Sequence, residues 1–125
     1  MNNGAKNILV VEDERRLREL AGRFLKKAGY NVTTAGDGEE ALKLYLELNR
    51  DFHLLLTDIV MPGMSGKELA DELDKISPEL KVLFMSGYTD DIILSHGVSQ
   101  KETHFLAKPF TSAALLETVR AVLDE

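Results

Sequence analysis

The sequence predicts an α/β fold in which helices cover both faces of a parallel sheet. Short apolar runs rich in Leu, Ile and Val alternate five times with stretches of helical periodicity. That alternation is typical of parallel strands joined by right-handed helical crossovers. A chain of 125 residues has room for one core of this kind. We therefore expect a single domain over residues 1–125, with a flexible leader over residues 1–6.

The first two units each join a strand to an amphipathic helix. Residues 8–11, ILVV, form an apolar run, and apolar residues then recur at helical spacing from Leu17 until Gly29. Residues 31–35, NVTTA, are rich in β-branched residues, which favours a strand, and their more polar character favours an edge of the sheet. In the helix that follows, Asp37 and Glu40 have the spacing of a capping box.

The remaining units continue the same alternation. LLLT at residues 54–57 and KVLFM at residues 81–85 are apolar at successive positions, which predicts strands buried on both faces. Between them, Ser65 and Glu68 repeat the capping-box spacing at the start of a third helix. Residues 87–97 have room only for a short fourth helix. The strand HFLA at residues 104–107 precedes a last helix capped by Thr111.

Composition excludes several classes of protein. The net charge is -6 and no basic cluster exceeds two residues, so we expect this chain to contact neither nucleic acid nor a membrane surface. Without cysteine it can form no disulfide and use no thiolate, which fits a reducing compartment. The first residues, MNNGAK, contain no apolar run of the length expected for a signal peptide, and nowhere do eighteen apolar residues follow one another. These features predict a cytoplasmic protein.

Polar side chains collect where the predicted strands end. In open α/β sheets, ligands bind outside the carboxyl ends of the strands. Glu12 and Asp13 follow the first strand, Asp58 the third, Ser86 the fourth and Lys108 the fifth. Three carboxylates, a hydroxyl and an amine should therefore converge at one end of the sheet.

Such a cluster must either take up a proton or hold a cation. Two carboxylates about 4 Å apart repel by roughly 4 kcal/mol at an effective dielectric constant near 20, and Lys108 supplies one positive charge. Mg²⁺ binds through one or two carboxylates together with waters and a phosphate, so we predict a Mg²⁺ site, with Mn²⁺ as an alternative. Taken singly, Asp13 and Asp58 could cap turns. Likewise, Ser86 alone suits a turn and Lys108 alone a solvated surface.

Four segments together resemble, in their order and spacing, the receiver domains of bacterial two-component response regulators. They are VVEDE, LLLTDIVMPGMSG, MSGYTDD and LAKPF. The resemblance extends from about Asn7 to the end of the chain. The sequences of the last two segments are most similar to those of receivers at the carboxyl end of hybrid sensor histidine kinases. The resemblance to receiver domains implies a flavodoxin-like (βα)5 doubly wound sandwich with strand order 2-1-3-4-5.

For the site, the resemblance implies that Asp58 is the phosphoacceptor, taking a phosphoryl group from a phosphohistidine as an acyl phosphate. Asp13, Asp58 and the backbone carbonyl of Val60 would ligate Mg²⁺, and Glu12 would act through a bound water. Ser86 and Lys108 would each bind a phosphoryl oxygen. This chemistry needs no separate base, because a carboxylate is already ionised at neutral pH.

Further positions carry over from the same family. Phe105 matches the aromatic switch that responds with Ser86 to phosphorylation, although it also suits an ordinary core aromatic. The Lys108-Pro109 peptide bond is expected to be cis. Val60 and Tyr88 occupy the two positions that tune the lifetime of the acyl phosphate. Since Val60 cannot orient an attacking water, we expect slow self-dephosphorylation.

The implied function is that of a signalling phosphoacceptor, which is not an enzyme although it assists its own phosphorylation and dephosphorylation. A hybrid kinase containing the domain would be a kinase as a whole. The expected partner is a histidine kinase or a histidine-phosphotransfer protein, which would contact Arg15, Arg16, Pro109 and Phe110. Dimerisation stays open, because the charge pattern of dimeric receivers is missing. The three histidines, with no metal-ligand spacing, are expected to be structural or on the surface: His53, His96 and His104.

Three other functions compete with this interpretation. A flavodoxin-like cofactor binder needs a Ser/Thr- and Gly-rich phosphate loop after the first strand, where this chain has VEDE. An aspartate-nucleophile phosphatase needs a second acid two positions after Asp58, where the chain has Val60. A degenerate receiver that only binds partners is disfavoured because every acidic, hydroxyl and lysine position is filled.

Overall fold

The structure, a computed structural model, describes residues 4–49, 51–87 and 104–125. Its five strands form one parallel sheet in the order β2-β1-β3-β4-β5, which confirms the predicted architecture. NVTTA lies at an edge of the sheet, as its polar character predicts. The strands are β1 (Asn7–Val11), β2 (Asn31–Ala35), β3 (Leu54–Asp58), β4 (Lys81–Ser86) and β5 (His104–Ala107).

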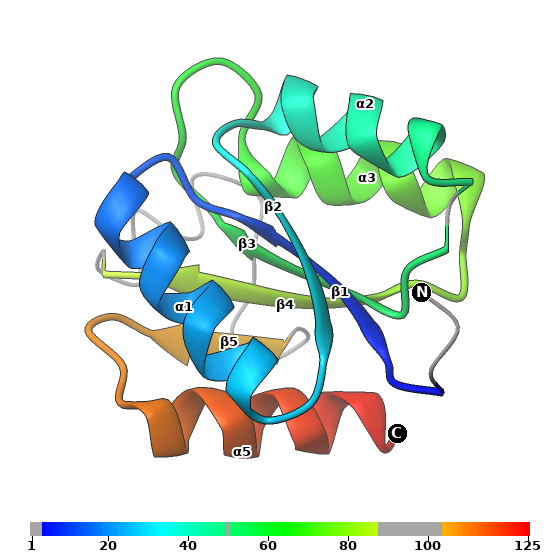
Figure 1. Cartoon of the computed structure of the whole chain (residues 1–125). Helices are drawn as coiled ribbons and strands as arrows, with labels where there is room; N and C mark the ends of the chain where they lie inside the picture. The colour runs from blue at the N-terminus through cyan, green and yellow to red at the C-terminus, as the bar shows by residue number, and fades with distance from the viewer. Residues whose placement is uncertain (1–3, 50, 88–103) are drawn as a thin grey trace.

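Helices cover both faces of this sheet (Figure 1). The helices α1 (Arg15–Lys27) and α5 (Ser112–Leu123) lie on one face, and α2 (Gly38–Glu47) and α3 (Gly66–Ile76) lie on the other. The hydroxyl of Thr111 caps α5, as predicted. The fourth helix expected near residues 87–97 falls almost wholly outside the described residues. Within the described ranges, no helix is long and apolar enough to cross a bilayer.

Strand β1 explains why the sequence shows unbroken apolar runs. Ile8 and Val10 pack into the apolar cluster under α1 and α5, whereas Leu9 and Val11 pack into the cluster under α2 and α3. All four side chains are fully buried, and burial of each contributes about 1.5–3 kcal/mol. A strand with a core on each face cannot alternate between apolar and polar residues.

The two predicted capping boxes differ. At α3 the box is complete, because Ser65 accepts from the amide of Glu68 while the Glu68 carboxylate accepts from the amide of Ser65. At α2, Asp37 accepts from the amide of Glu40 as predicted. The Glu40 carboxylate, however, accepts from the amide of Gly36, one residue before the cap. The prediction of a complete capping box at the start of α2 is therefore wrong.

A buried polar network lies at the amino end of β1. Asn7 is 2% exposed, and its backbone amide donates to Nδ1 of His53 at 2.9 Å. The side-chain amide of Asn7 donates to the carbonyl of Asp51, and its oxygen accepts from Asn31, both at 2.9 Å. The network fastens the start of β1 to β2 and to the segment that enters β3.

The histidines have the structural or surface places that the sequence predicts, where the structure describes them. His53 is partly buried in the Asn7 network. His104, at the start of β5, contacts the carboxylate of Glu125 at 2.8 Å on the surface. His96 lies outside the described residues.

Candidate functional site

The acidic pair after β1 divides between the interior and the solvent. Glu12 is 1% exposed, and its amide donates to the carbonyl of Ala35 at the end of β2. One carboxylate oxygen of Glu12 accepts from the amide of Glu14 at 3.0 Å, which holds the side chain over the turn into α1. Asp13 is exposed. The chain thus places one acid inside the end of the sheet and the next at its mouth.

Asp58 ends β3 beside this pair and is 4% exposed. Two hydrogen bonds fix the backbone after Asp58: the amide of Ile59 donates to the carbonyl of Met85, and the amide of Gly66 donates to the carbonyl of Ile59. A Cβ atom on Gly66 would overlap the carbonyl oxygen of Asp58. Only glycine therefore lets the start of α3 lie directly against the backbone of Asp58.

Lys108 reaches the two buried acids from the end of β5. Its amide donates to the carbonyl of Ser86 at 3.0 Å, and its peptide bond to Pro109 is cis, as expected. The ammonium nitrogen donates to Glu12 at 2.6 Å and to Asp58 at 3.0 Å. With the side chain only 19% exposed, these are charge-assisted hydrogen bonds shielded from water.

The carboxylates are arranged to hold a cation. One oxygen each of Glu12, Asp13 and Asp58 lies within 4.8 Å of the others. Oδ1 of Asp58 is buried and has no hydrogen-bond partner among the described residues. An unsatisfied buried acceptor is costly, and a hard cation at this oxygen would remove the cost. The donor set of carboxylate oxygens fits Mg²⁺.

The electrostatics of the cluster agree with this arrangement. Burial raises the pKa of Asp58, and the charge of Asp13 adds to the increase, although Lys108 opposes it. Burial likewise raises the pKa of Glu12, against the opposing effect of Lys108 and with a contribution from Asp58. Burial alone would lower the pKa of Lys108, but its bonds to the two acids raise it above the ordinary value.

The remaining predicted site residues lie around the same edge or on the adjoining face. Ser86 ends β4, is 2% exposed and pairs with Ala107 of β5. Val60 and Phe105 are partly buried, and both pack against the apolar cluster on the α2 and α3 side of the sheet. Tyr88 lies outside the described residues.

Sequence reasoning missed two residues that support the site. Arg18 on α1 donates to the carbonyl of Glu12 at 2.8 Å, but in the sequence it is one of several basic residues at exposed helical positions. Gly66 contacts the backbone of Asp58. A glycine inside a helix costs about 1 kcal/mol relative to alanine, so its place in the first turn of α3 was a usable signal of close packing.

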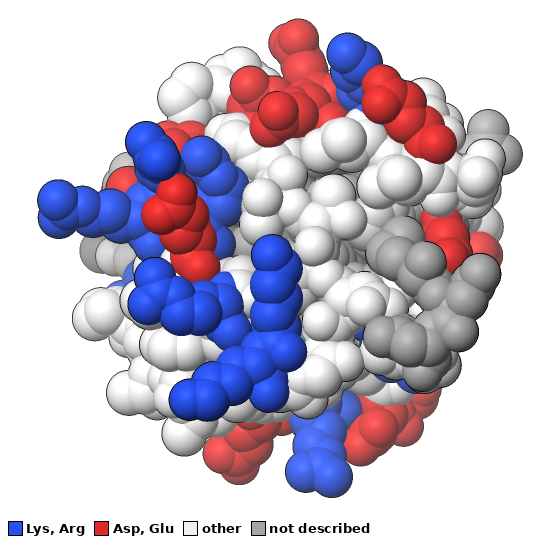
Figure 2. Space-filling view, viewed as in Figure 1, with Lys and Arg blue, Asp and Glu red and all other residues white. Residues whose placement is uncertain are grey.

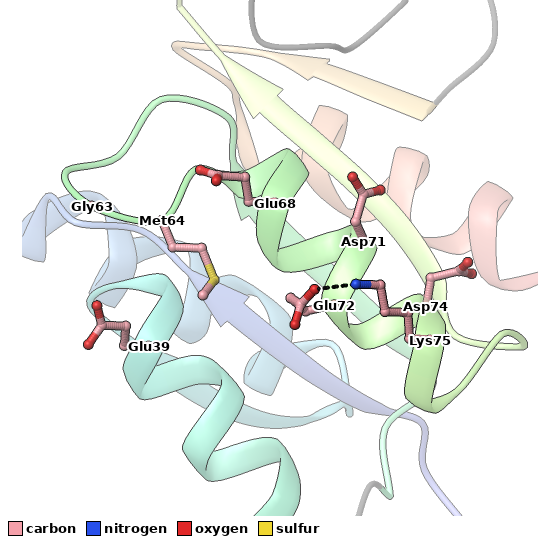
Figure 3. A pocket seen from close by; sticks show the side chains of 8 residues that line it. All are labelled: Glu39, Gly63, Met64, Glu68, Asp71, Glu72, Asp74 and Lys75. Atoms are coloured by element: carbon pink, nitrogen blue, oxygen red, sulfur yellow. Dashed lines mark hydrogen bonds and ion pairs between the residues drawn. The ribbon is translucent and has the colours of Figure 1, made fainter.

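An open pocket lies away from this acidic site. It has a volume of about 740 Å³ between α2 and α3, and Figure 3 shows its mostly acidic lining. Much of that charge is already paired along α3: Lys75 bonds Glu72 at 2.8 Å, and Lys67 bonds Asp71 at 2.6 Å. These pairs are exposed and solvated, so they add little to the stability of α3.

The helix α1 gathers positive charge that is spread out in the sequence. It carries six basic residues and one acidic residue, Glu19, in a chain whose net charge is -6. Figure 2 shows Lys and Arg side chains over α1, whereas acidic side chains lie over α2. The absence of long basic runs in the sequence thus concealed a basic helix. Its basic residues are Arg15, Arg16, Arg18, Arg23, Lys26 and Lys27.

The fold and the site define a class of protein: doubly wound α/β domains that carry three carboxylates and a lysine at the ends of their strands. Comparison with known families makes the assignment specific, because the response regulator receiver domain matches residues 8–120. The chain belongs to this family, whose members are the phosphoacceptor domains of two-component signalling. The resemblance predicted from the sequence is confirmed.

Similar proteins and structures support the assignment. The chain is 37% identical to the sensor kinase CckA of Brucella abortus (strain 2308) over 98% of its own length but only 13% of CckA. It is 36% identical to the receiver protein CpdR of the same organism, covering 94% of this chain and 97% of CpdR.

Solved structures agree with these sequence relatives. The crystal structure of the receiver domain from the hybrid histidine kinase CckA matches with a TM-score of 0.79 and 36% identity, over 94% of this chain and 98% of that one. The Vibrio cholerae chemotaxis protein CheY4 matches with a TM-score of 0.83 and 30% identity, over 95% of this chain and 99% of that one.

Proposed function

We propose that Asp58 accepts a phosphoryl group from a phosphohistidine. The observation that carries this proposal is the pairing of Asp58, whose Oδ2 accepts from Lys108 at 3.0 Å while its Oδ1 is buried without a partner among the described residues. A carboxylate fixed through one oxygen has the other available for bonding. A nucleophile needs such an unpaired oxygen, whereas a carboxylate that serves only in a structural ion pair does not need one.

The transfer requires positioning more than acid-base chemistry. An oxygen of Asp58 forms a bond to phosphorus as the bond from phosphorus to the donor histidine nitrogen breaks. The histidine ring, protonated on its other nitrogen, keeps that electron pair and leaves as a neutral imidazole. The negative charge of the transition state lies mainly on the three equatorial phosphoryl oxygens. Lys108 is close enough to Asp58 to neutralise part of it, and Ser86 can donate a hydrogen bond from the end of β4.

Asp13, Asp58 and the backbone carbonyl of Val60 would hold Mg²⁺, and Glu12 would act through a water. Bound Mg²⁺ would offset the repulsion between these carboxylates and an incoming phosphoryl group. The proximity of the three carboxylates supports this ligand set, since their oxygens lie within 4.8 Å of one another. The Lys108 ammonium must then share the two buried acids with the metal.

The conformational response would pass through Ser86 and Phe105. Phe105 lies next to Phe84 in the pairing of β5 with β4, and Ser86 is the last residue of β4. A partly buried ring on an edge strand can change its packing when the hydroxyl of Ser86 is drawn to the phosphoryl group. For Val60, the apolar side chain packed on the core supports slow hydrolysis of the acyl phosphate. The tuning role of Tyr88 stays a prediction.

The proposed partner is a histidine kinase or a histidine-phosphotransfer protein. The basic surface of α1, which begins at Arg15 and Arg16 beside the acidic pair, supports docking there together with Pro109 and Phe110. We infer that the domain is a substrate of its partner and not itself an enzyme. A cytoplasmic location, a single domain over residues 1–125 and the absence of nucleic-acid and membrane contacts stay predictions.

Intact-mass analysis tests the proposed reaction. Wild-type protein incubated with Mg²⁺ and acetyl phosphate should gain one base-labile phosphoryl group. Asp58→Asn and chelator-treated protein should gain none, whereas the control Asp74→Asn, an exposed acid on α3, should react like the wild type. An adduct that persists in Asp58→Asn would contradict the assignment of the phosphoacceptor.

A further inference from the structure

Arg18 connects the two loops that border the acidic site. From the first turns of α1, its Nη1 donates to the carbonyl oxygen of Glu12 at 2.8 Å. Its guanidinium also lies against Gly36, in the loop between β2 and α2. A Cβ atom on Gly36 would be 3.1 Å from Nη1 and 3.7 Å from Cζ of Arg18.

The loop at Gly36 is fastened from its other side. The amide of Gly36 donates to Oε1 of Glu40 at 2.7 Å, and the same Cβ position on Gly36 would lie 3.8 Å from that oxygen. Asp37 then caps α2 through the amide of Glu40 at 2.8 Å. This explains why Glu40 leaves the expected capping box: its carboxylate holds the loop that packs against Arg18.

A small cavity separates these two loops on the solvent side of Asp13. Its volume is about 240 Å³, so a side chain or several waters can enter beside the acidic site. Arg18 contacts two of the segments around it, at Glu12 and at Gly36. The residues that line it include Asp13 after β1, Gly36 and Asp37 in the loop after β2, Gly38 at the start of α2, and Pro62 and Met64 in the loop after β3.

We propose that Arg18 is the positioning residue that holds Glu12 and Asp13 in place for the cation. The carbonyl oxygen that it binds belongs to the peptide unit joining these two acids, and a peptide unit is planar and rigid. Fixing that oxygen fixes the amide nitrogen and the Cα atom of Asp13, so the side chain of Asp13 leaves the backbone from a fixed point. The acids are therefore held together, despite their mutual repulsion, before a cation arrives.

This inference rests on the proposed function, since it assigns Arg18 a part in the same site. A residue that only fastens α1 to the sheet would lower stability when removed and leave the affinity of the folded protein for Mg²⁺ unchanged. A positioning residue would lower that affinity in protein that is still folded. Substitution of groups that orient metal ligands typically costs about 10- to 100-fold in affinity.

Titration calorimetry with Mg²⁺ alone, together with urea unfolding, separates the two roles. Arg18→Met should weaken Mg²⁺ binding about tenfold, and Arg18→Lys should recover part of the loss because it keeps a donor. Gly36→Ala provides a second route, because its methyl group should push the guanidinium aside while leaving Arg18 in the chain. The matched control is Arg23→Met, an exposed arginine on the same helix, which should stay within about twofold of the wild type.

The inference would be overturned if folded Arg18→Met and Gly36→Ala both bound Mg²⁺ within about twofold of the wild type. It would also be overturned by equal losses in Arg18→Met and Arg23→Met, because a general charge effect would then suffice. Wild-type protein that bound Mg²⁺ but accepted no phosphoryl group would overturn the proposed function and leave the role of Arg18 standing. Wild-type protein that bound no Mg²⁺ would overturn both.

Discussion

The two ends of β1 bury polar side chains in opposite ways. At the amino end, the amide and carbonyl of the Asn7 side chain each have a partner, and its backbone amide bonds His53. At the carboxyl end, Glu12 lies with Asp58 around one lysine, and Oδ1 of Asp58 has no partner among the described residues. The cluster at the amino end of β1 is therefore fully hydrogen-bonded at the Asn7 side chain, whereas the cluster at the carboxyl end includes a buried oxygen without a partner among the described residues.

This difference separates stability from reactivity. Neutral groups with complementary partners fasten three strands without excess charge, so the amino end should contribute to the free energy of unfolding alone. Buried carboxylates that repel each other oppose folding, and they persist where the surrounding structure holds them. The carboxyl end should therefore respond to substitution in both reactivity and stability.

The largest effect should come from Lys108→Met. Removal of the ammonium leaves Glu12 and Asp58 as buried carboxylates without a countercharge, which costs about 3 kcal/mol in the free energy of unfolding. Phosphorylation by acetyl phosphate should slow by about 100-fold, since a cation at the transferring group is lost. Urea unfolding and intact mass measure the two effects. A stable and reactive Lys108→Met protein would remove the proposed contrast between the ends.

Gly66→Ala should follow. The added methyl group meets the backbone carbonyl of Asp58, so the chain must move, at a cost of about 2–3 kcal/mol. Because the displaced backbone belongs to the proposed phosphoacceptor, we expect the phosphorylation rate to fall as well. Gly29→Ala is the control for loss of glycine alone: it has a positive φ but open space around it, and it should lose stability without losing reactivity. Equal phosphorylation rates in the two variants would contradict the expectation.

Asn7→Ala sharpens the comparison from the other end. It removes the partner of the Asp51 carbonyl and of the Asn31 amide, which should lower the free energy of unfolding by about 1–3 kcal/mol. The rate of phosphorylation should not change, since the network lies at the opposite end of β1. A slower reaction in folded Asn7→Ala would mean that the two ends are coupled through the strand.

The smallest effect is a dependence of stability on pH. The pKa of Asp58 is raised by burial, so its ionised form opposes folding at neutral pH, and the opposition is relieved as the pH falls through the raised value. We expect Asp58→Asn to be more stable than the wild type at pH 7, and the difference to shrink as the pH is lowered through the raised pKa of Asp58. Unfolding titrations at several pH values measure it. A difference that grew on acidification would reverse the sign assigned to this pKa shift.

Much of the fold follows from local patterns that single segments carry. The strand at NVTTA, the cap at Ser65 and the unbroken apolar runs at LLLT and VLFM each depend on neighbouring residues. The candidate site was also predictable, because parallel strands bring their carboxyl ends to one edge. Glu12, Asp58 and Lys108 meet there for that reason.

The features of the site that could not be predicted from the sequence depend on contacts between segments that are distant in the chain. Glu12 is buried and Asp13 exposed, although they are adjacent and chemically similar. Arg18 acts on a backbone carbonyl, whose position no side-chain pattern predicts. The incomplete box at Glu40 has the same origin, because a loop amide competes for its carboxylate.

The ammonium of Lys108, bonded to both buried acids, is a counter-ion tethered to the chain. Proteins that rely on a free ion to balance such charges lose their fold when that ion is withdrawn. Here a chelator should leave the fold intact and withdraw only the capacity to react. Fluctuations in available magnesium would then change the responsiveness of the receiver, while the amount of folded protein stayed constant.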